Sequence, residues 1–249
     1  MPAKKNESNL ALSMELLWGN PKKTGWSGLS PQSIIADAVA LADAGGLSAV
    51  SMRRIADRLG AGTMSLYAHV PGKADLVGLM VDAVLNRLYS DVQEPSRQGG
   101  WRQGVRFVAA ANWAVFGRHP WLLETSGSRP LLGPSLCLKY EAELGPLDGI
   151  GLSDLEMDSV LTLVLTHVEG TARGLAAQKK QAAEGSDGDW WAEVGPLLEK
   201  WMDGSQYPLS GRVGQAAGEA HQGPGDPSYA YSFGLDRILD SVELLIRGR

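Results

Sequence analysis

Apolar residues recur at three- and four-residue spacing along most of the chain, which is the periodicity of helices with one buried face. No segment keeps the two-residue alternation of a half-buried strand, so the chain is predicted to be all α. A stretch rich in glycine and proline over 203–227 predicts a loop. Beyond residue 90, helices are predicted over 101–118, 134–144, 153–183 (opened by a capping box of Ser153 and Glu156), 187–202 and 231–247.

The first ninety residues predict shorter helices around a tight turn. Ser30 and Pro31 are typical of a helix start, and the glycine pair at 45–46 ends that helix. A long amphipathic helix is predicted over 73–89. Residues 51–73 predict a helix-turn-helix, with an N-cap, an apolar set that packs the two short helices together, and a glycine turn. The N-cap is Ser51, and the glycine turn is Gly60-Ala61-Gly62. The apolar set consists of Ile55, Leu59, Met64 and Leu66.

The second short helix of this pair presents hydrogen-bonding side chains, namely Thr63, Ser65, Tyr67 and His69. Such side chains are suited to base edges and phosphates in a major groove. Lys73 opens the next helix, where a cation beside the free amides of a helix N-terminus suits a phosphate. Met64 can either meet a thymine methyl group or shield the helix. The segment therefore predicts a DNA-reading head.

This segment and the helices that flank it resemble a known family of proteins. Residues 30–89 resemble the N-terminal domain of TetR-family transcriptional regulators, above all in Leu66-Tyr67-x-His69-Val70 followed by Lys73. The resemblance implies a three-helix helix-turn-helix domain over 30–89 and a larger helical ligand-binding and dimerisation domain over 90–249. It also implies that Arg53 faces the groove and that Tyr67 and His69 contact phosphates, although Ala68 is smaller than the residue of many relatives. The residues expected to contact DNA are Lys22, Lys23, Ser51, Arg53, Thr63, Met64, Ser65, Tyr67, His69 and Lys73.

Residues 1–29 form an extension before this domain. A short helix is expected to end at Met14–Trp18, and a basic arm with Lys22 and Lys23 follows it. A similar Leu-Leu-Trp-Gly and basic arm occur in a subgroup of TetR-like proteins that includes actinobacterial regulators of antibiotic exporters. The resemblance implies minor-groove contacts by the arm, which is physically sensible for lysine. A disordered tail is the alternative.

The larger domain is expected to hold a ligand. Aromatic residues lie on the same predicted helices as several polar groups, and an apolar cavity with a few polar groups is typical of small-molecule sites. The aromatic residues favour a flat, multi-ring ligand, and ordinary core packing is the alternative. The candidate ligand-binding residues are Asn112, Trp113, Phe116, Trp121, His167, Thr171 and Arg173.

The resemblance further implies a homodimer, paired through a four-helix bundle of the helices 153–183 and 231–247. The last helix carries a continuous apolar stripe, which a monomer would leave partly exposed. A two-fold dimer would read a palindromic operator in double-stranded DNA, with recognition helices about 34–36 Å apart. The candidate interface residues are Val164, Ile238, Val242 and Ile246.

Charge and composition agree with this division. The chain of 249 residues has a net charge of −5, divided into +2 over residues 1–89 and −7 over residues 90–249. A slightly basic head and an acidic body have the right signs for a DNA-binding protein. The single cysteine, Cys137, can form no internal disulfide, and the apolar stretch Leu10–Trp18 is too short for a membrane span and makes a poor signal peptide. We therefore expect a cytoplasmic protein with no membrane partner.

The sequence carries only weak signals of an enzyme. Gly60-x-Gly62-x-x-Ser65 follows a helix and lacks a third glycine, so it is no dinucleotide fingerprint. The sequence has no Gly-x-Ser-x-Gly elbow and no His-Glu-x-x-His pair, so we expect no cofactor and no metal site. The predicted function is a ligand-responsive transcriptional repressor. Two alternatives remain: a helical small-molecule enzyme, or a DNA-binding protein that responds to no ligand.

Overall fold

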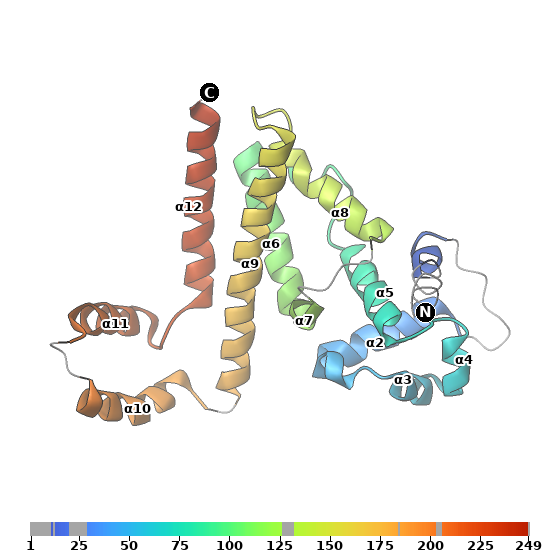
Figure 1. Cartoon of the computed structure of the whole chain (residues 1–249), viewed down its shortest axis with the longest axis horizontal. Helices are drawn as coiled ribbons and strands as arrows, with labels where there is room; N and C mark the ends of the chain where they lie inside the picture. Colours follow the sequence, from blue (N-terminus) through green and yellow to red (C-terminus); the bar gives the residue numbers. More distant parts are fainter. Residues whose placement is uncertain are drawn as a thin grey trace, which may run out of the picture. The chain divides into compact units, whose positions relative to one another are not determined.

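The computed structural model describes residues 11, 13–19, 29–125, 132–183, 185–202 and 206–248 (Figure 1). Within these ranges every regular element is a helix, which confirms the all-α prediction. The chain forms two compact units, one up to Thr162 and one over Leu163–Gly248. Each unit is described below by itself.

The first unit begins with the predicted head helices. A capping box starts the first of them, because the Ser33 N–H donates to Ser30 Oγ at 3.1 Å and the Ser30 N–H donates to Ser33 Oγ at 3.0 Å. The last ends at Leu85, four residues before the predicted end at Tyr89. The elements are α2 (Pro31–Gly45), η1 (Leu47–Ala49), α3 (Met52–Leu59), α4 (Thr63–Tyr67) and α5 (Lys73–Leu85).

The turn between α3 and α4 depends on one glycine. Gly60 has φ 64° in the left-handed region and caps α3, and its N–H donates to the carbonyl of Ala56. A side chain at Gly60 would be strained in this conformation. Gly62 is extended, with φ −74°, and serves as the N-cap of α4. Of the predicted glycine pair, therefore, only Gly60 uses the conformational freedom of glycine.

The head has an apolar core to which each of its helices contributes. Its fully buried members include Ile34, Ile55, Leu66, Leu76 and Met80. Met64 was predicted to join this core, but its side chain is 79% exposed. The reason is geometric: Leu66 faces inward, and residues two apart on a helix point to nearly opposite sides. The prediction that Met64 packs α3 against α4 is therefore wrong.

Three further helices complete the first unit, namely α6 (Trp101–Arg118), α7 (Leu122–Thr125) and α8 (Pro134–Leu144). The bounds of α6 and α8 confirm the predicted helices over 101–118 and 134–144. Short helices η2 (Pro95–Arg97) and η3 (Gly145–Leu147) flank them. Val115, Trp121 and Leu122 belong to the same buried cluster as the head residues. The first unit therefore extends past the predicted domain division at residue 90.

The expected short helix before the head is present over residues 13–18. Leu16 and Leu17 pack against the core of the head, and the Ser13 hydroxyl donates to the Asp75 carboxylate of α5. The Trp18 indole N–H donates to the carbonyl of Leu132 at 2.8 Å. This helix is thus anchored to the first unit. The basic arm with Lys22 and Lys23 lies outside the described residues.

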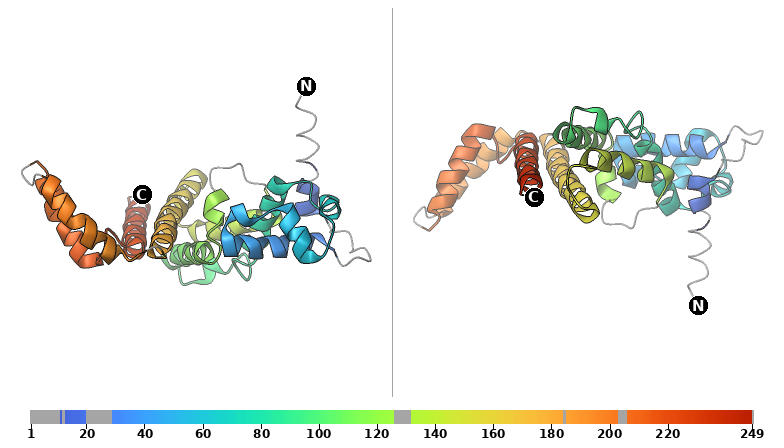
Figure 2. Two further views of the ribbon diagram at one scale, coloured as in Figure 1. Left: turned by 90° about the horizontal axis from the view of Figure 1, so that it is seen from below. Right: turned by 90° about the horizontal axis from the view of Figure 1, so that it is seen from above.

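The second unit is built on α9 (Asp154–Ala182), which starts in the first unit, and on α12 (Pro227–Arg247). These helices lie side by side (Figures 1 and 2). His167 Nε2 of α9 is 2.9 Å from the carbonyl oxygen of Tyr231, and the two rings stack with centroids 6.3 Å apart. One of the two bonds of the capping box expected at the start of α9 is present, because the Ser153 N–H donates to the Glu156 carboxylate at 2.8 Å, and the Ser153 hydroxyl donates to the same carboxylate at 2.7 Å.

Two helices lie between α9 and α12 in the chain and project away from that pair (Figure 2). α10 (Asp187–Trp201) confirms the predicted helix over 187–202, whereas α11 (Pro208–His221) lies in the predicted loop over 203–227. The loop prediction is wrong there. Pro208 suits the first turn of a helix, and the glycines of α11 are spaced by three and four residues along an exposed helix.

We predict that Ile55→Ala destabilises the first unit by about 2–5 kcal/mol, because it leaves a cavity in the core of the head. Met64→Ala is the matched control, and its exposed side chain should change the free energy of unfolding by less than about 0.5 kcal/mol. Urea unfolding of the full chain, followed by circular dichroism, measures both. Equal effects of the two substitutions would contradict the packing described here.

Candidate functional site

The exposed side of α3 and α4 is the candidate DNA-binding face, and the two helices lie at one edge of the head (Figure 1). The Arg53 side chain is 87% exposed, and its only ion-pair distance among the described residues is 4.0 Å, to Asp57. Met64, Ser65 and Tyr67 are exposed on α4. Thr63, the first residue of α4, and His69, two residues after its end, are half-buried.

The two adjacent arginines of α3 differ in what they contact. Arg54 Nη1 donates to the carbonyl oxygen of Ala49 at 3.1 Å, which holds this guanidinium against η1. The Arg54 N–H also donates to Ser51 Oγ at 3.2 Å, so Ser51 caps α3 as predicted. Arg53 makes no such contact with the head. Arg53 is therefore the arginine of this pair that extends from the head, with five donors in a planar fork.

Lys73 is less free than the sequence suggests. Its Nζ donates to the carbonyl oxygen of Leu47 at 2.9 Å, which joins the start of α5 to η1. The side chain is nevertheless exposed, and an ammonium group carries three N–H donors. Lys73 thus stabilises the head and keeps donors for a phosphate.

A buried carboxylate joins the end of the head to the helices that follow. Glu143 of α8 is 1% exposed, and its carboxylate accepts from Tyr89 Oη at 2.8 Å, Asn112 Nδ2 at 2.6 Å and Lys139 Nζ at 2.6 Å. Burial, together with the charge of Glu143, raises the pKa of Tyr89 far above its usual value. The Tyr89 phenol therefore stays neutral and donates.

Other polar contacts bind the same helices together. Asp43 of α2 accepts from the Trp121 indole N–H at 2.7 Å and lies 2.7 Å from His119 Nδ1. Asp82 of α5 accepts from the Ser135 N–H at 3.0 Å and from the Ser135 hydroxyl at 2.8 Å, and so caps α8. These contacts join both long head helices, α2 and α5, to α6–α8.

The predicted ligand-binding residues of the first unit are held by this packing. Asn112 donates to Glu143 and to the carbonyl of Val108, and Trp121 is buried in the core of the head, which Phe116 also contacts. Trp113 is half-buried on α6. Trp121 is a core residue, 1% exposed, and its indole N–H is paired with Asp43.

The predicted ligand-binding residues of the second unit also have polar groups that are paired within the chain. The Thr171 hydroxyl donates to the carbonyl of His167 at 2.8 Å, and Arg173 pairs with Glu169 at 2.8 Å. Thr171 lines a shallow apolar pocket of about 440 Å³ with Gly174. The larger pocket of this unit is lined by other residues.

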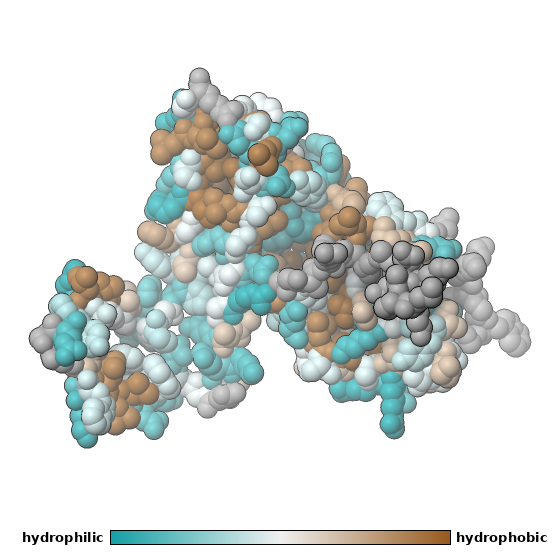
Figure 3. Space-filling view, in the orientation of Figure 1, coloured by the Kyte–Doolittle hydropathy of each residue, from teal (hydrophilic) through white to brown (hydrophobic). Residues whose placement is uncertain are grey.

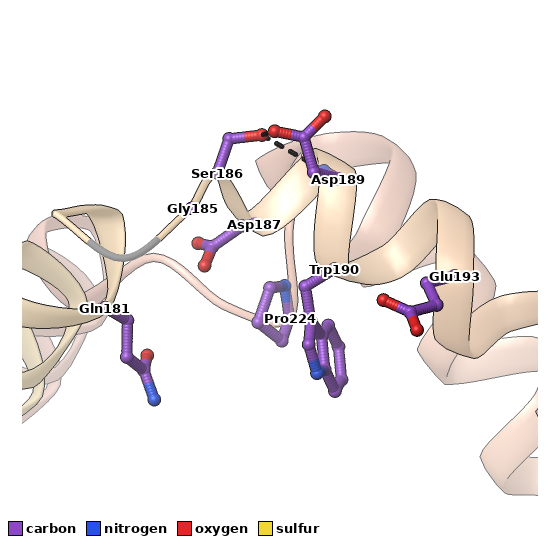
Figure 4. Close-up of a pocket in the computed structure, with 8 residues that line it drawn as sticks. All are labelled: Gln181, Gly185, Ser186, Asp187, Asp189, Trp190, Glu193 and Pro224. Carbon is purple, nitrogen blue, oxygen red and sulfur yellow. Dashed lines mark hydrogen bonds between the residues drawn. The ribbon is translucent and has the colours of Figure 1, made fainter.

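That larger pocket, of about 520 Å³, lies at the start of α10 (Figure 4). Three acidic residues line it, of which Asp189 points away from Trp190 and accepts from the Ser186 hydroxyl at 2.6 Å, and the Trp190 indole lies beside Pro224. Ser186 caps α10, since its Oγ accepts the Asp189 N–H at 3.0 Å. Acidic residues are favoured at any helix start, so the sequence did not single them out. The lining residues are Gln181, Gly185, Ser186, Asp187, Asp189, Trp190, Glu193 and Pro224.

No group of three or more His, Cys, Asp or Glu side chains among the described residues is placed to hold a metal ion. None of the described helices is both long and apolar enough to cross a membrane.

Comparison with known proteins agrees with the geometry of the head. Residues 34–80 match the family described as bacterial regulatory proteins, tetR family. Residues 94–246 match the C-terminal domain described as tetracyclin repressor-like. The chain belongs to the TetR family. It is a DNA-binding transcriptional regulator and not an enzyme.

Individual relatives of this TetR-family chain have regulatory names. It is 37% identical to the HTH-type transcriptional repressor DrrR1 of Streptomyces coeruleorubidus, over 97% of this chain and 88% of that protein. It is 30% identical to an HTH-type transcriptional regulator of Saccharopolyspora erythraea, over 75% of this chain and 78% of that one. The structure of ActR from Streptomyces coelicolor in complex with actinorhodin is 26% identical, with a TM-score of 0.71, over 88% of this chain and 98% of that one.

We predict that Tyr89→Phe destabilises the first unit by about 1.5–3 kcal/mol, because it removes a hydrogen bond to the buried Glu143 carboxylate. Tyr140→Phe is the control, because this phenol also donates to a carboxylate, Asp158 at 2.8 Å, but in an exposed position. Its unfolding midpoint should stay at the wild-type value. Thermal unfolding of both variants measures the difference, and a wild-type midpoint for Tyr89→Phe would contradict the role given to Glu143.

Proposed function

We propose that this TetR-family regulator is a repressor that binds a palindromic operator as a homodimer and is released by an aromatic small molecule. The observation that carries the proposal is the helix-turn-helix with its exposed Arg53 and α4 side chains. The name of the repressor DrrR1, at 37% identity, supports the direction of regulation. The complex of ActR with actinorhodin supports an effector.

In this proposal Arg53 reads a base and Lys73 contacts a phosphate. A guanidinium can donate two hydrogen bonds to O6 and N7 of guanine, which specifies that base. The Lys73 ammonium, held near the start of α5 by Leu47, would contribute charge without reading sequence. Ser65, Met64 and Tyr67 would complete the contacts from α4.

The operator sequence can be obtained by selection from a randomised double-stranded pool. On that operator, Arg53→Ala should lose about 1–3 kcal/mol of discrimination at one base position in each half-site. Lys73→Ala should instead weaken binding to all sequences and make the salt dependence shallower by about one unit of slope. Fluorescence anisotropy titrations with single-base operator variants measure both effects.

Arg54→Ala is the matched control for Arg53→Ala. It removes the same charge from the next position of α3, but the Arg54 guanidinium is bound to the carbonyl of Ala49. Arg54→Ala should leave the base preference intact. If Arg53→Ala also kept the wild-type preference at every position, the assignment of the reading residue would be overturned.

The dimer would form through exposed apolar residues of the second unit. Of the predicted interface residues, Val164 and Val242 are buried within the single chain, and Ile238 and Ile246 are half-buried. The surface a second copy can reach is instead the outer side of the same helices. Apolar residues gather over the C-terminal half of α12 (Figure 3). The exposed apolar residues of α9 and α12 in this unit are Leu163, Tyr229, Phe233, Leu244 and Leu245.

We predict that Leu244→Glu converts the dimer to a monomer. Leu244 is 71% exposed in one chain, so the substitution spares the fold, but an unpaired charge buried in the interface costs several kcal/mol. Leu138→Glu is the control, because Leu138 is an exposed leucine of α8 in the first unit. Light scattering at micromolar concentration should show a monomer for Leu244→Glu and a dimer for Leu138→Glu. A dimer in both would place the interface elsewhere.

The effector pocket we propose is the one lined by Trp190. Its carboxylates and its indole fit an aromatic ligand that carries a cationic group, since such a group is attracted by carboxylates and by an indole face. A ligand that favours the state with low operator affinity must bind the DNA-free protein more tightly. Ligand binding and operator release are therefore coupled.

We predict that 1-naphthylmethylammonium binds the DNA-free protein, quenches its tryptophan fluorescence and releases the operator, whereas the neutral 1-ethylnaphthalene binds more weakly. Trp190→Ala should weaken binding and release together. Trp201→Ala is the control, because Trp201 is on the same helix but does not line the pocket. Unchanged binding by Trp190→Ala would move the effector site away from α10.

A further inference from the structure

A further cavity, of about 440 Å³, lies within the first unit, between the head helices α2 and α5 and the C-terminal end of α6. We call this cavity the groove. Its apolar lining includes Ile35 and Val39 from α2, Val84 from α5 and Val115 from α6. Its volume is within the range of small-molecule sites.

Positive charge lines this groove. Arg118 lies in the last turn of α6, and Arg87 follows the end of α5. None of the described residues that line the groove is acidic. The neighbouring carboxylate of Asp43 is engaged by Trp121 and lies beside His119. The groove therefore combines apolar side chains with guanidinium groups.

These two arginines differ from three other exposed arginines of the chain. Arg58, Arg173 and Arg237 each pair with a carboxylate at 2.7–2.8 Å. Within the described part of the chain, Arg87 and Arg118 form neither an ion pair nor a side-chain hydrogen bond. A guanidinium presents donors in a planar fork that fits a carboxylate or sulfonate. Both forks remain available to a ligand.

We propose that this groove binds an amphipathic organic anion: an aromatic or alicyclic acid whose ring contacts Ile35, Val39 and Val115 and whose acid group contacts Arg87 and Arg118. The groove is a different site from the Trp190 pocket, whose three carboxylates would repel an anion. A neutral compound with the same ring would lose the contacts with the arginines.

The position of the groove links a bound anion to the helices of the DNA-binding head. The groove is lined by both long helices of the head and by α6, so a bound anion contacts all three at once. If binding changes the operator affinity by some factor, the operator must change the affinity for the anion by the same factor. The coupling between the anion and the operator rests on the proposed operator binding. Binding of the anion to the groove does not depend on that proposal, because it is tested without DNA.

The probe is 1-anilinonaphthalene-8-sulfonate, and N-phenyl-1-naphthylamine is the same ring system without the sulfonate. Calorimetric titration of the full chain should show tighter binding of the sulfonate. Arg118→Ala and Arg87→Ala should each weaken binding of the sulfonate by about three- to tenfold, as expected for the loss of one solvent-exposed hydrogen bond, and leave the affinity for the neutral compound unchanged. Arg118→Lys should retain most of the affinity.

Arg212→Ala is the matched control, because it removes the same charge from the exposed surface of α11, and it should bind the sulfonate like the wild type. Ala36→Trp should block both compounds, since Ala36 lines the groove and is exposed, so that a larger side chain fills the space without entering the core. Thermal unfolding midpoints confirm that each variant is folded.

Hydrogen exchange of the full chain locates the site. The sulfonate should protect amides in residues 32–39, 83–87 and 115–119, which contribute the groove. Wild-type affinity in Arg118→Ala, Arg87→Ala and Ala36→Trp would overturn the proposal. Protection confined to residues 186–193 would also overturn it, because it would place the anion in the Trp190 pocket, and neither result would bear on operator binding by α3 and α4.

Discussion

The architecture of the first unit depends on a core that the DNA-binding head cannot complete by itself. Trp121, which follows α6, is 1% exposed within the core of the head, and its indole N–H is bound to Asp43 of α2. Val115 and Leu122 join the same cluster. A buried indole contributes a large apolar area, and its hydrogen bond fixes its orientation. The corner between α6 and α7 is therefore part of the head, and a displacement of α6 disturbs the packing of α2.

Polar contacts fix the positions of the packed helices relative to one another, which apolar burial alone does not do. A buried carboxylate must have donors at fixed positions, because an unsatisfied buried charge is costly. Glu143 finds them on Tyr89 and Asn112 besides Lys139 of its own helix, and so it fixes α8 relative to the end of α5 and to α6. Asp82 fixes the other end of α8 through Ser135. Apolar helices could slide along one another, but these donors and acceptors select one position.

The sequence predicted local features well and long-range contacts poorly. The helix-turn-helix was predictable because Ser51, Gly60 and the apolar spacing act within a few residues of where they stand. Trp121 was interpreted as a ligand-binding residue, because its partner Asp43 is 78 positions away and an aromatic residue in a helical pattern does not reveal whether it borders a cavity or a core. The predictions for Met64 and for the segment that forms α11 were wrong for other reasons. The five-residue helix α4 is too short for its apolar spacing to show which side faces the core. The glycine- and proline-rich composition of the segment over 203–227 predicted a loop, although Pro208 is a suitable first residue for a helix.

The strength of these links bears on how a small molecule can act on the head. A hundredfold loss of operator affinity corresponds to about 2.7 kcal/mol. One buried hydrogen bond to a charged group contributes about 1.5–3 kcal/mol, which is the scale of the Trp121–Asp43 or the Tyr89–Glu143 contact. A ligand bound in the proposed groove therefore would not have to unfold or rebuild the first unit to act on the proposed operator binding. It is sufficient that it prefers, by the strength of a single such bond, an arrangement of α6 that these contacts do not allow. The groove beside α2 and α5 lies next to the Asp43 contact through His119, which makes that contact the one most directly exposed to a bound ligand.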